Sequence, residues 1–141
     1  EILDLKHTEL PPCDGHTSYG HENVAKVSEM VKRADGIILA TPIYNYSINS
    51  AAKNLIELTG RQWENKVVAF LCSAGGESSY MSIMGIATSL MLDFRCHIIP
   101  RFVYASGESF RDGALIDEEI GKRISHLVVE TLRVSRALKV S

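Results

Sequence analysis

One short segment of the sequence, TPIYNYS, combines residue types that suit the binding of an aromatic ligand. It offers flat aromatic faces at Tyr44 and Tyr46 and an amide at Asn45, next to Pro42 and Ile43. Every position except the proline also contributes a backbone N–H donor, whatever its side chain. Taken alone, the segment is equally compatible with an ordinary turn between two structural elements.

A second segment, SAGGESS, consists almost entirely of small residues. The hydroxyl of Ser73 precedes Gly75 and Gly76, whose backbone N–H groups are not shielded by side chains. Together with TPIYNYS, it suits a flat ring with heteroatoms along its edge, held mainly by backbone hydrogen bonds. A β-carbon at either glycine is expected to crowd such a ring or to forbid the backbone dihedral angles. A Gly-Gly pair alone indicates only a tight turn, so the hypothesis depends on both segments.

The apolar runs before the two segments predict that both follow strands of one sheet. GIILA, residues 36–40, and VVAFLC, residues 67–72, are apolar throughout, which is typical of parallel strands covered on both faces. A helix over residues 49–59, capped by Asn49 or Ser50, is predicted after the first segment. Ligands bind at the carboxyl ends of strands in open α/β sheets, so we expect one shared site.

The remaining sequence alternates between predicted strands and helices. Further strands are predicted at residues 1–5 (EILDL) and 97–104 (interrupted by Pro100), and further helices at 22–34, at 80–92 and from Asp117 onward. The predicted buried face of the helix 49–59 consists of Ala51, Ala52, Leu55, Ile56 and Thr59. Trp63 is expected to cover an edge of the core. The order of elements predicts a single α/β domain with an open parallel sheet and helices on both faces, a three-layer α/β/α arrangement.

Composition excludes several classes of function. The 141 residues carry a net charge of −2 without a basic patch, which argues against nucleic acid as the main partner. No apolar run approaches the roughly 20 residues of a membrane span, so we expect no membrane partner. The spacing of histidines and cysteines fits no zinc pattern, so no metal site is predicted.

Three scattered cysteines predict reduced thiols and a cytoplasmic protein, because no C-x-x-C pair is present. Cys72 lies at the end of an apolar run and is interpreted as a core residue rather than a nucleophile. The predicted helix 80–92 is apolar nearly all round, which is typical of a helix buried on two sides. We therefore expect a homodimer or homotetramer with this helix at the interface.

The segment ATPIYNYSINSAAKNLIEL resembles the T-P-E-Y-N-x-S-x-P-x-x-L-K-N-x-I-D motif of the NADPH-dependent FMN reductases. SAGG after VVAFLC matches the next loop of that family. The resemblance covers about residues 21 to 104. It implies a flavodoxin-like fold and membership of a group that includes quinone, chromate and azo-dye reductases.

The resemblance also implies roles for individual residues. The first loop of the family contacts the N5–O4 edge of the isoalloxazine ring, largely through backbone atoms. We transfer that role to Pro42, Ile43, Tyr44 and Asn45, with Tyr46 beside them. The second loop contacts the pyrimidine side of the ring, a role that we transfer to Ser73, Gly75 and Gly76. Lys53 and Asn54 match the K-N pair of the family and are expected to be structural.

The sequence departs from the family at two places within the motif and at its front. Ile43 replaces a common glutamate, and Asn49-Ser50 replaces a pair that contains proline. Nothing matches the G-S-x-R-x-x-S-x-N loop that holds the FMN phosphate in the family. We expect the natural protein to be longer, with a first strand, the phosphate loop and a first helix that this sequence lacks.

The function implied is that of an NAD(P)H oxidoreductase that uses FMN and NADPH and reduces a small-molecule electron acceptor such as a quinone or a free flavin. Alignment of the ring and hydrogen bonds to it are the contribution expected of the protein, so we name no catalytic side chain. Two alternatives stay open. One is a flavodoxin-like electron carrier, and the other is a non-catalytic relative that has lost FMN. The sequence does not select the acceptor, or NADH over NADPH.

Overall fold

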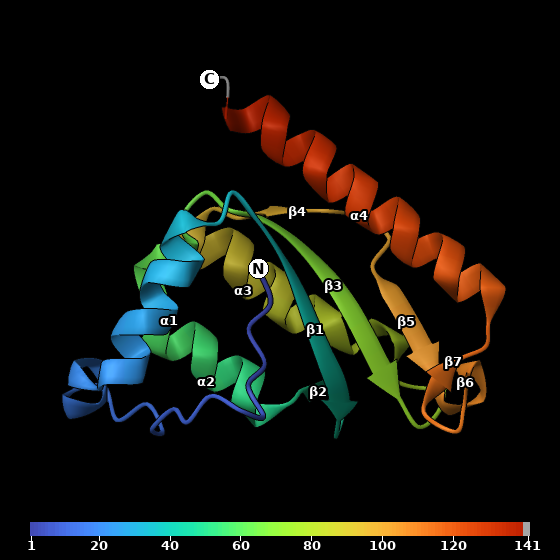
Figure 1. Cartoon of the computed structure of the whole chain (residues 1–141), viewed down its shortest axis with the longest axis horizontal. Helices are drawn as coiled ribbons and strands as arrows, with labels where there is room; N and C mark the ends of the chain where they lie inside the picture. The colour runs from blue at the N-terminus through green and yellow to red at the C-terminus, as the bar shows by residue number, and fades with distance from the viewer. Residues whose placement is uncertain (140–141) are drawn as a thin grey trace.

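The computed structural model describes residues 1–139 and shows one α/β unit (Figure 1). Its strands are β1 (Gly36–Tyr44), β2 (Ser47–Ile48), β3 (Val67–Ala74), β4 (His97–Ile98), β5 (Val103–Ser106), β6 (Phe110–Arg111) and β7 (Ala114–Leu115). Its α-helices are α1 (Glu22–Arg33), α2 (Ser50–Thr59), α3 (Met84–Phe94) and α4 (Glu118–Lys139). Short 3₁₀ helices are η1 (Thr17–Gly20), η2 (Gly60–Trp63), η3 (Tyr80–Ile83) and η4 (Gly107–Ser109).

The sheet is built on the parallel pair β1 and β3, which runs in register from Gly36 opposite Val67 to Pro42 opposite Ser73. Both β4 and β5 pair with the other edge of β3, also in parallel. The short β2 pairs antiparallel with the end of β1, so the sheet is mixed but mostly parallel. The arrowheads of β1, β3 and β5 in Figure 1 point to one edge, where the two predicted binding segments begin.

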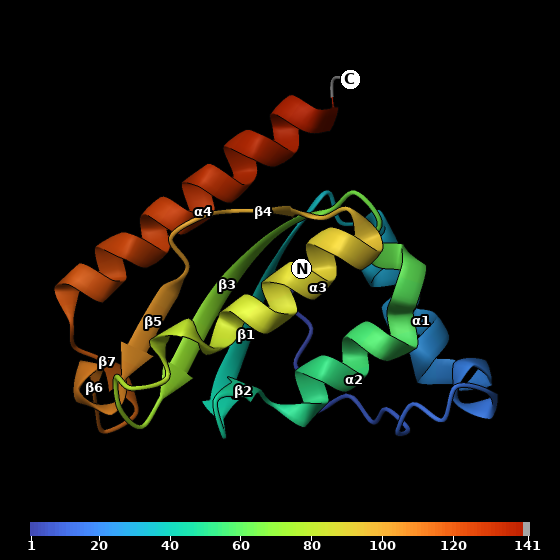
Figure 2. The ribbon, with the colours of Figure 1, turned by 180° about the vertical axis from the view of Figure 1, so that it is seen from behind.

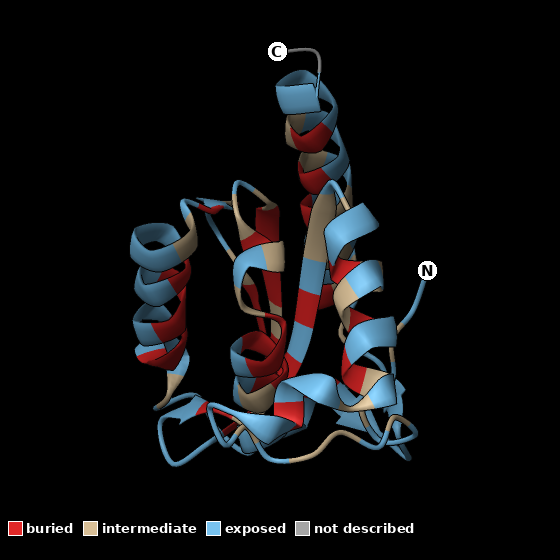
Figure 3. Ribbon diagram, turned by 90° about the vertical axis from the view of Figure 1, so that its left-hand side faces the viewer, coloured by how far each residue is buried: buried red, intermediate tan, exposed pale blue. Residues whose placement is uncertain are grey.

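Helices cover both faces of this sheet, as predicted. Helices α1, α2 and α3 pack on one face, around a core cluster that includes Phe70 and Trp63. Helix α4 crosses the other face and packs on β1, β3 and β5 around Val67, Ala69 and Val103. The view from behind in Figure 2 shows the separation of the two layers, and Figure 3 shows that buried positions gather on the strands and the helix faces turned towards them.

Local sequence signals explain where the helices begin. The side chain of Asn49 accepts a hydrogen bond from the backbone N–H of Ala52 at 3.0 Å and caps α2, as predicted. Asp117 caps α4 by accepting from the N–H groups of Glu119 and Ile120 at 2.9 and 3.1 Å. In α1, the buried positions Val24, Val27 and Val31 follow the helical period.

Three predictions about the fold are wrong. Residues 1–5 form no strand, because the segment has no strand partner; Leu3 and Leu5 instead pack against the core cluster. Ala51 is exposed, because the buried stripe of α2 runs through Ala52, Leu55 and Leu58. Trp63 is fully buried rather than at an edge. Its indole N–H donates to the hydroxyl of Thr59 at 2.7 Å, so the polar group of this buried side chain has a hydrogen-bond partner.

The last predicted strand, residues 97–104, is interrupted as expected. Its two parts, β4 and β5, are separated by Pro100 and by Arg101, which has a positive φ of 59°. The predicted helix at 80–92 begins with the 3₁₀ turn η3, and α3 follows it. Ile86, Ala87 and Leu90 of α3 are buried against the sheet. Its apolar side chains Met84, Met91 and Leu92 are exposed in this single chain.

Candidate functional site

The first predicted binding segment forms a hairpin rather than an irregular turn. Strand β1 continues through the predicted turn residues to Tyr44, and Tyr44 pairs with Ser47 of β2. The two residues between them, Asn45 and Tyr46, both have positive φ, of 49° and 64°. This conformation is characteristic of the type I′ turn and disfavours residues with a β-carbon, asparagine less than tyrosine. The hairpin displays both tyrosine side chains, which are largely exposed.

A polar contact joins this hairpin to the start of α2. The N–H of Asn49 donates to the hydroxyl of Thr41 at 3.4 Å, and that hydroxyl lies 3.3 Å from the Asn49 side-chain oxygen. Thr41 is buried within β1, whereas Asn49 caps the helix. The contact fixes the entry of α2 relative to the hairpin. Sequence reasoning missed Thr41 because its partner lies beyond the turn.

The second predicted segment lies beside the first. Strand β3 extends to Ala74, two residues further than predicted, so Ser73 belongs to the strand and pairs in register with Pro42. Gly75 and Gly76 follow directly, on the same edge of the sheet as the hairpin. The structure therefore brings the predicted residues together at neighbouring strand ends. Ile43 contributes backbone only, because its side chain is buried in the core.

The two glycines border open space. A β-carbon built on Gly75 or on Gly76 meets no protein atom within 4 Å, and neither glycine has a positive φ. The expectation that the backbone dihedral angles exclude a side chain here is therefore wrong. A side chain at Gly75 or Gly76 would occupy the space next to the exposed backbone of the loop. That space is available to a ligand held by backbone groups.

Cys72 precedes this loop and is not a nucleophile. It is buried, and burial raises the pKa of its thiol to about 12. A thiol with such a pKa is protonated near neutral pH, whereas the thiolate is the reactive form. The interpretation of Cys72 as a core residue is confirmed.

The K-N pair of the motif has structural contacts, as predicted. Asn54 accepts from the N–H of Cys13 at 2.8 Å and donates to the carbonyl of Pro11 at 2.9 Å. It thereby fixes the irregular segment that precedes α1. Lys53 forms an exposed ion pair with Glu57 on the same helix.

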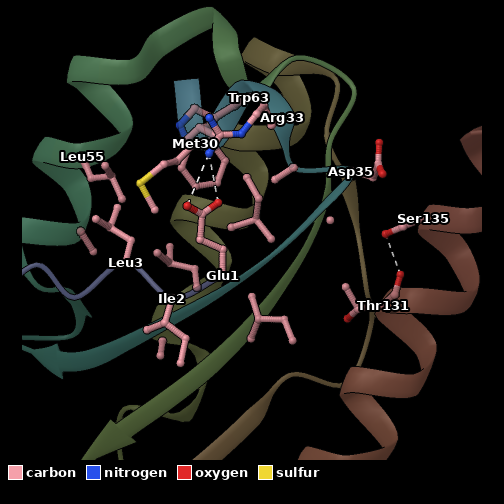
Figure 4. A pocket seen from close by; sticks show the side chains of 18 of the residues that line it. Glu1, Ile2, Leu3, Met30, Arg33, Asp35, Leu55, Trp63, Thr131 and Ser135 are labelled. Atoms are coloured by element: carbon pink, nitrogen blue, oxygen red, sulfur yellow. Dashed lines mark hydrogen bonds and ion pairs between the residues drawn. The ribbon is translucent and has the colours of Figure 1, made fainter. Parts of the chain in front are cut away.

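A large cavity lies along the free edge of β1 rather than at the two loops (Figure 4). It has a volume of about 1080 Å³ and reaches from Pro42 and Asn49 to Asp35. Leu3, Leu55 and Trp63 lie on its one side, and Thr131 and Ser135 of α4 lie on the other. Its floor is the strand edge itself, so the cavity is the space beside the unpaired edge of β1.

The hydrogen bonds between β1 and β3 determine which backbone groups of β1 face the cavity. The N–H of Val67 donates to the carbonyl of Asp35 at 3.3 Å, which places the backbone groups of alternate residues towards β3. The intervening residues Gly36, Ile38 and Ala40 then present their N–H and C=O groups to the cavity. Among residues 1–139, no strand pairs with this stretch of β1 on that side.

Within residues 1–139, no helix is long and apolar enough to cross a membrane. The same range contains no group of three or more side chains suited to binding a metal ion. His21, from the histidine-containing segment, has a structural contact: its ring nitrogen accepts from the N–H of Asn23 at 3.2 Å and caps α1.

Comparison with known families adds independent information. Residues 1–110 match the family described as "NADPH-dependent FMN reductase". The match includes both loops of the candidate site and the strands that carry them.

Two curated relatives match nearly the whole chain. An "NAD(P)H-dependent FAD/FMN reductase" from Geobacillus thermodenitrificans is 34% identical over 99% of this chain and 77% of the relative. An "NADPH azoreductase" from Bacillus sp. is 32% identical over 94% of this chain and 75% of the relative. The chain therefore spans about three quarters of the length of these relatives.

The fold has a counterpart among solved structures. The "flavoenzyme NAD(P)H:(acceptor) oxidoreductase (FerB)" from Paracoccus denitrificans superimposes with a TM-score of 0.76. The superposition covers 97% of this chain and 80% of the other, at 19% sequence identity. At that identity the likeness concerns the fold, and it agrees with the three-layer arrangement described above.

Proposed function

The chain belongs to the NADPH-dependent FMN reductase family, and we propose that it acts as an NAD(P)H-dependent oxidoreductase that binds FMN between the β1 hairpin and the Gly75–Gly76 loop. The electron acceptor is proposed to be a small molecule such as a quinone or a free flavin. The observation that carries the proposal is the placement of both loops at neighbouring strand ends, with open space beside the two glycines. Each relative named above is a reductase that uses NAD(P)H or NADPH.

The residues present fit the ring portion of FMN. An isoalloxazine ring is flat and carries heteroatoms on its edges, so it suits exposed backbone groups and flat side chains. The β1 hairpin offers the faces of Tyr44 and Tyr46 and the amide of Asn45. The facing loop offers Ser73 and the backbone of Gly75 and Gly76, where a ring can approach closely. We propose these residues as the ring-binding set.

The chain contributes position rather than acid–base chemistry. FMN, when bound, supplies the centre that accepts hydride from NAD(P)H and passes electrons to the acceptor. The parallel pair of β1 and β3 holds the two loops at a fixed separation, and the Thr41–Asn49 contact limits motion of the hairpin. Preorganised loops lower the free-energy cost of aligning two reactants. Cys72 takes no part, because its thiol is buried and protonated.

A visible spectrum of the purified natural protein tests the proposal. Absorption bands of oxidised flavin are expected, with bleaching on anaerobic addition of NADPH. Flavin bands that NADPH does not bleach would favour an electron carrier. The absence of bands after incubation with FMN would indicate a relative that has lost the cofactor.

We also propose that the protein acts as a dimer or tetramer through α3. Met84, Met91 and Leu92 are exposed on one helix, and Leu92 is 80% exposed. With Tyr80 and Met81 of the preceding turn, they form an apolar surface of the kind that monomers rarely present. Sedimentation of the protein as a monomer at micromolar concentration would contradict this assignment.

The prediction that the domain contains a further strand stays a proposal. The free edge of β1 supports it, because Gly36, Ile38 and Ala40 present backbone groups to an apolar cavity. A parallel strand there has apolar side chains on both faces and bonds to these three residues. Amide hydrogen exchange of the natural protein tests this: pairing protects the N–H groups of all three, and fast exchange would contradict it.

A further inference from the structure

The strand β5 supplies a hydroxyl group that holds the glycine loop. Tyr104 donates from its hydroxyl to the carbonyl of Gly76, with 2.6 Å between the two oxygens. Among residues 1–139, no other side-chain hydrogen bond reaches residues 73–79. Tyr104 pairs in register with Cys72, four residues before Gly76, so its side chain extends alongside the loop as the loop leaves β3. The two residues are far apart in sequence, and the sheet brings them together.

Packing fixes the position of that hydroxyl. Tyr104 is only 7% exposed. The ring of Tyr80 meets it edge-on, with centroids 5.7 Å apart, and stacks on Phe102 at 4.9 Å. A buried aromatic ring has few rotamers, so its hydroxyl is a fixed donor.

This contact determines the orientation of one peptide group in the loop. A peptide bond is planar and trans, so its C=O and N–H point in opposite directions. With the Gly76 carbonyl directed to Tyr104, the N–H of Glu77 points away from it. A glycine loop without such a contact has access to many orientations. A second carbonyl, that of Gly75, lies 3.4 Å from a β-carbon position on Gly107, so the backbone after β5 also approaches this loop closely.

We propose that Tyr104 is a positioning residue, which orients the Gly76–Glu77 peptide group and thereby prepares the loop to receive the flavin ring. The inference rests on the proposed function for its ligand. It adds a residue outside both binding segments, from a strand that the sequence patterns did not connect with the site. Tyr104 acts on FMN through the loop and needs no contact with the ring.

The size of the effect follows from the lost hydrogen bond. A single intramolecular hydrogen bond contributes about 0.5–1.5 kcal/mol, which corresponds to a factor of about 2 to 12. Without the hydroxyl, the population of loops in the binding-competent orientation falls by up to this factor. The apparent dissociation constant rises in inverse proportion to that population.

The test compares Tyr104→Phe with the matched variant Tyr80→Phe in the whole protein. Each removes one hydroxyl from the same aromatic cluster, but only Tyr104 donates to the loop. Fluorescence titration with FMN measures affinity, and the visible band of bound FMN reports its polar surroundings. NMR order parameters for the N–H groups of residues 75–77 measure loop rigidity without ligand. Circular dichroism and thermal unfolding verify the fold.

We expect Tyr104→Phe to raise the FMN dissociation constant about 2- to 12-fold, to shift the visible band and to lower the loop order parameters. Tyr80→Phe is expected to leave all three unchanged. Equal affinity and equal order parameters in both variants would overturn the inference, even if Tyr104→Phe lowers the melting temperature, because that pattern belongs to a purely structural residue.

Two further outcomes of the experiment can be distinguished from a failure of the inference. If the wild type binds no FMN, the proposed function fails, and the order parameters alone decide whether Tyr104 orients the loop. If Tyr104→Phe does not fold, the order parameters of the wild type decide. A loop held by the Tyr104 hydroxyl is rigid at residues 75–77, and low order parameters there would overturn the inference.

Discussion

Replacement of Gly76 by valine tests whether the open space beside the loop is the flavin site. The structure makes this substitution unusually informative, because a β-carbon on Gly76 meets no protein atom within 4 Å and its φ is not positive. The protein therefore accommodates the β-carbon of the new side chain without a clash or a forbidden backbone conformation. Any loss of FMN affinity reports the ligand rather than the fold.

The expected magnitude comes from the approach distance of a hydrogen bond. A backbone N–H must come within about 2.9 Å of a ring heteroatom to bond with it. A valine side chain in the space between them prevents that approach. Loss of one such bond, with a buried polar atom left unsatisfied, costs about 1–3 kcal/mol, or about 5- to 150-fold in the dissociation constant.

Fluorescence titration of FMN into the natural protein and the variant measures this change, with far-ultraviolet circular dichroism as the folding control. Gly20→Val is the matched control, because its β-carbon also meets no protein atom within 4 Å and it lies outside both loops. The control is expected to bind FMN as the wild type does. If Gly76→Val also keeps its affinity and its fold, the flavin is misplaced in our proposal.

Other predictions concern stability and its dependence on pH. Tyr46→Gly removes the β-carbon from a residue with a positive φ of 64° and is expected to stabilise the ligand-free protein by about 0.5–1 kcal/mol. The left-handed conformation costs more in tyrosine than the added chain entropy costs in glycine, and a lower melting temperature would contradict this. Gly36→Ala places a β-carbon 2.4 Å from the Ser135 hydroxyl and 3.2 Å from a Thr131 methyl. It is expected to lower the free energy of unfolding by about 1–3 kcal/mol in urea titrations, with partial recovery in combination with Ser135→Ala, and additive effects in the double mutant would refute the clash. Burial raises the pKa of the Cys72 thiol from 9.0 to about 12, so the folded state holds this proton more tightly than the unfolded state. The contribution of this thiol to stability is fully present below about pH 9 and is lost as the pH rises towards about 12. Chemical unfolding across this range is expected to show a smaller fall in the free energy of unfolding for Cys72→Ala than for the wild type. An equal fall in both proteins would show that the thiol is not responsible.

Several features of the site were accessible from sequence because they depend on local patterns. Continuous apolar runs predict β1 and β3, since strands covered on both faces have no polar side to show. The residues after each run then fall at the carboxyl edge of the sheet, which placed Tyr44, Asn45, Gly75 and Gly76 correctly. Helix caps are equally local: Asn49 acts within three residues of its own position.

The tertiary structure decided whatever depends on a partner distant in sequence. EILDL alternates like a strand but forms none, because a strand needs a neighbour with free backbone groups and this segment pairs with none. The hairpin at Asn45 and Tyr46 depends on the pairing of β2 with β1, which no periodicity reports.

The contact between Tyr104 and Gly76 shows the same division most clearly. The sequence by itself determined that a strand ends near Tyr104 and that a loop of small residues contains Gly76. Only the register of β5 on β3 places the hydroxyl of one against the carbonyl of the other. A hydrogen bond requires an approach of about 3 Å, and the sheet, rather than either segment, fixes that distance.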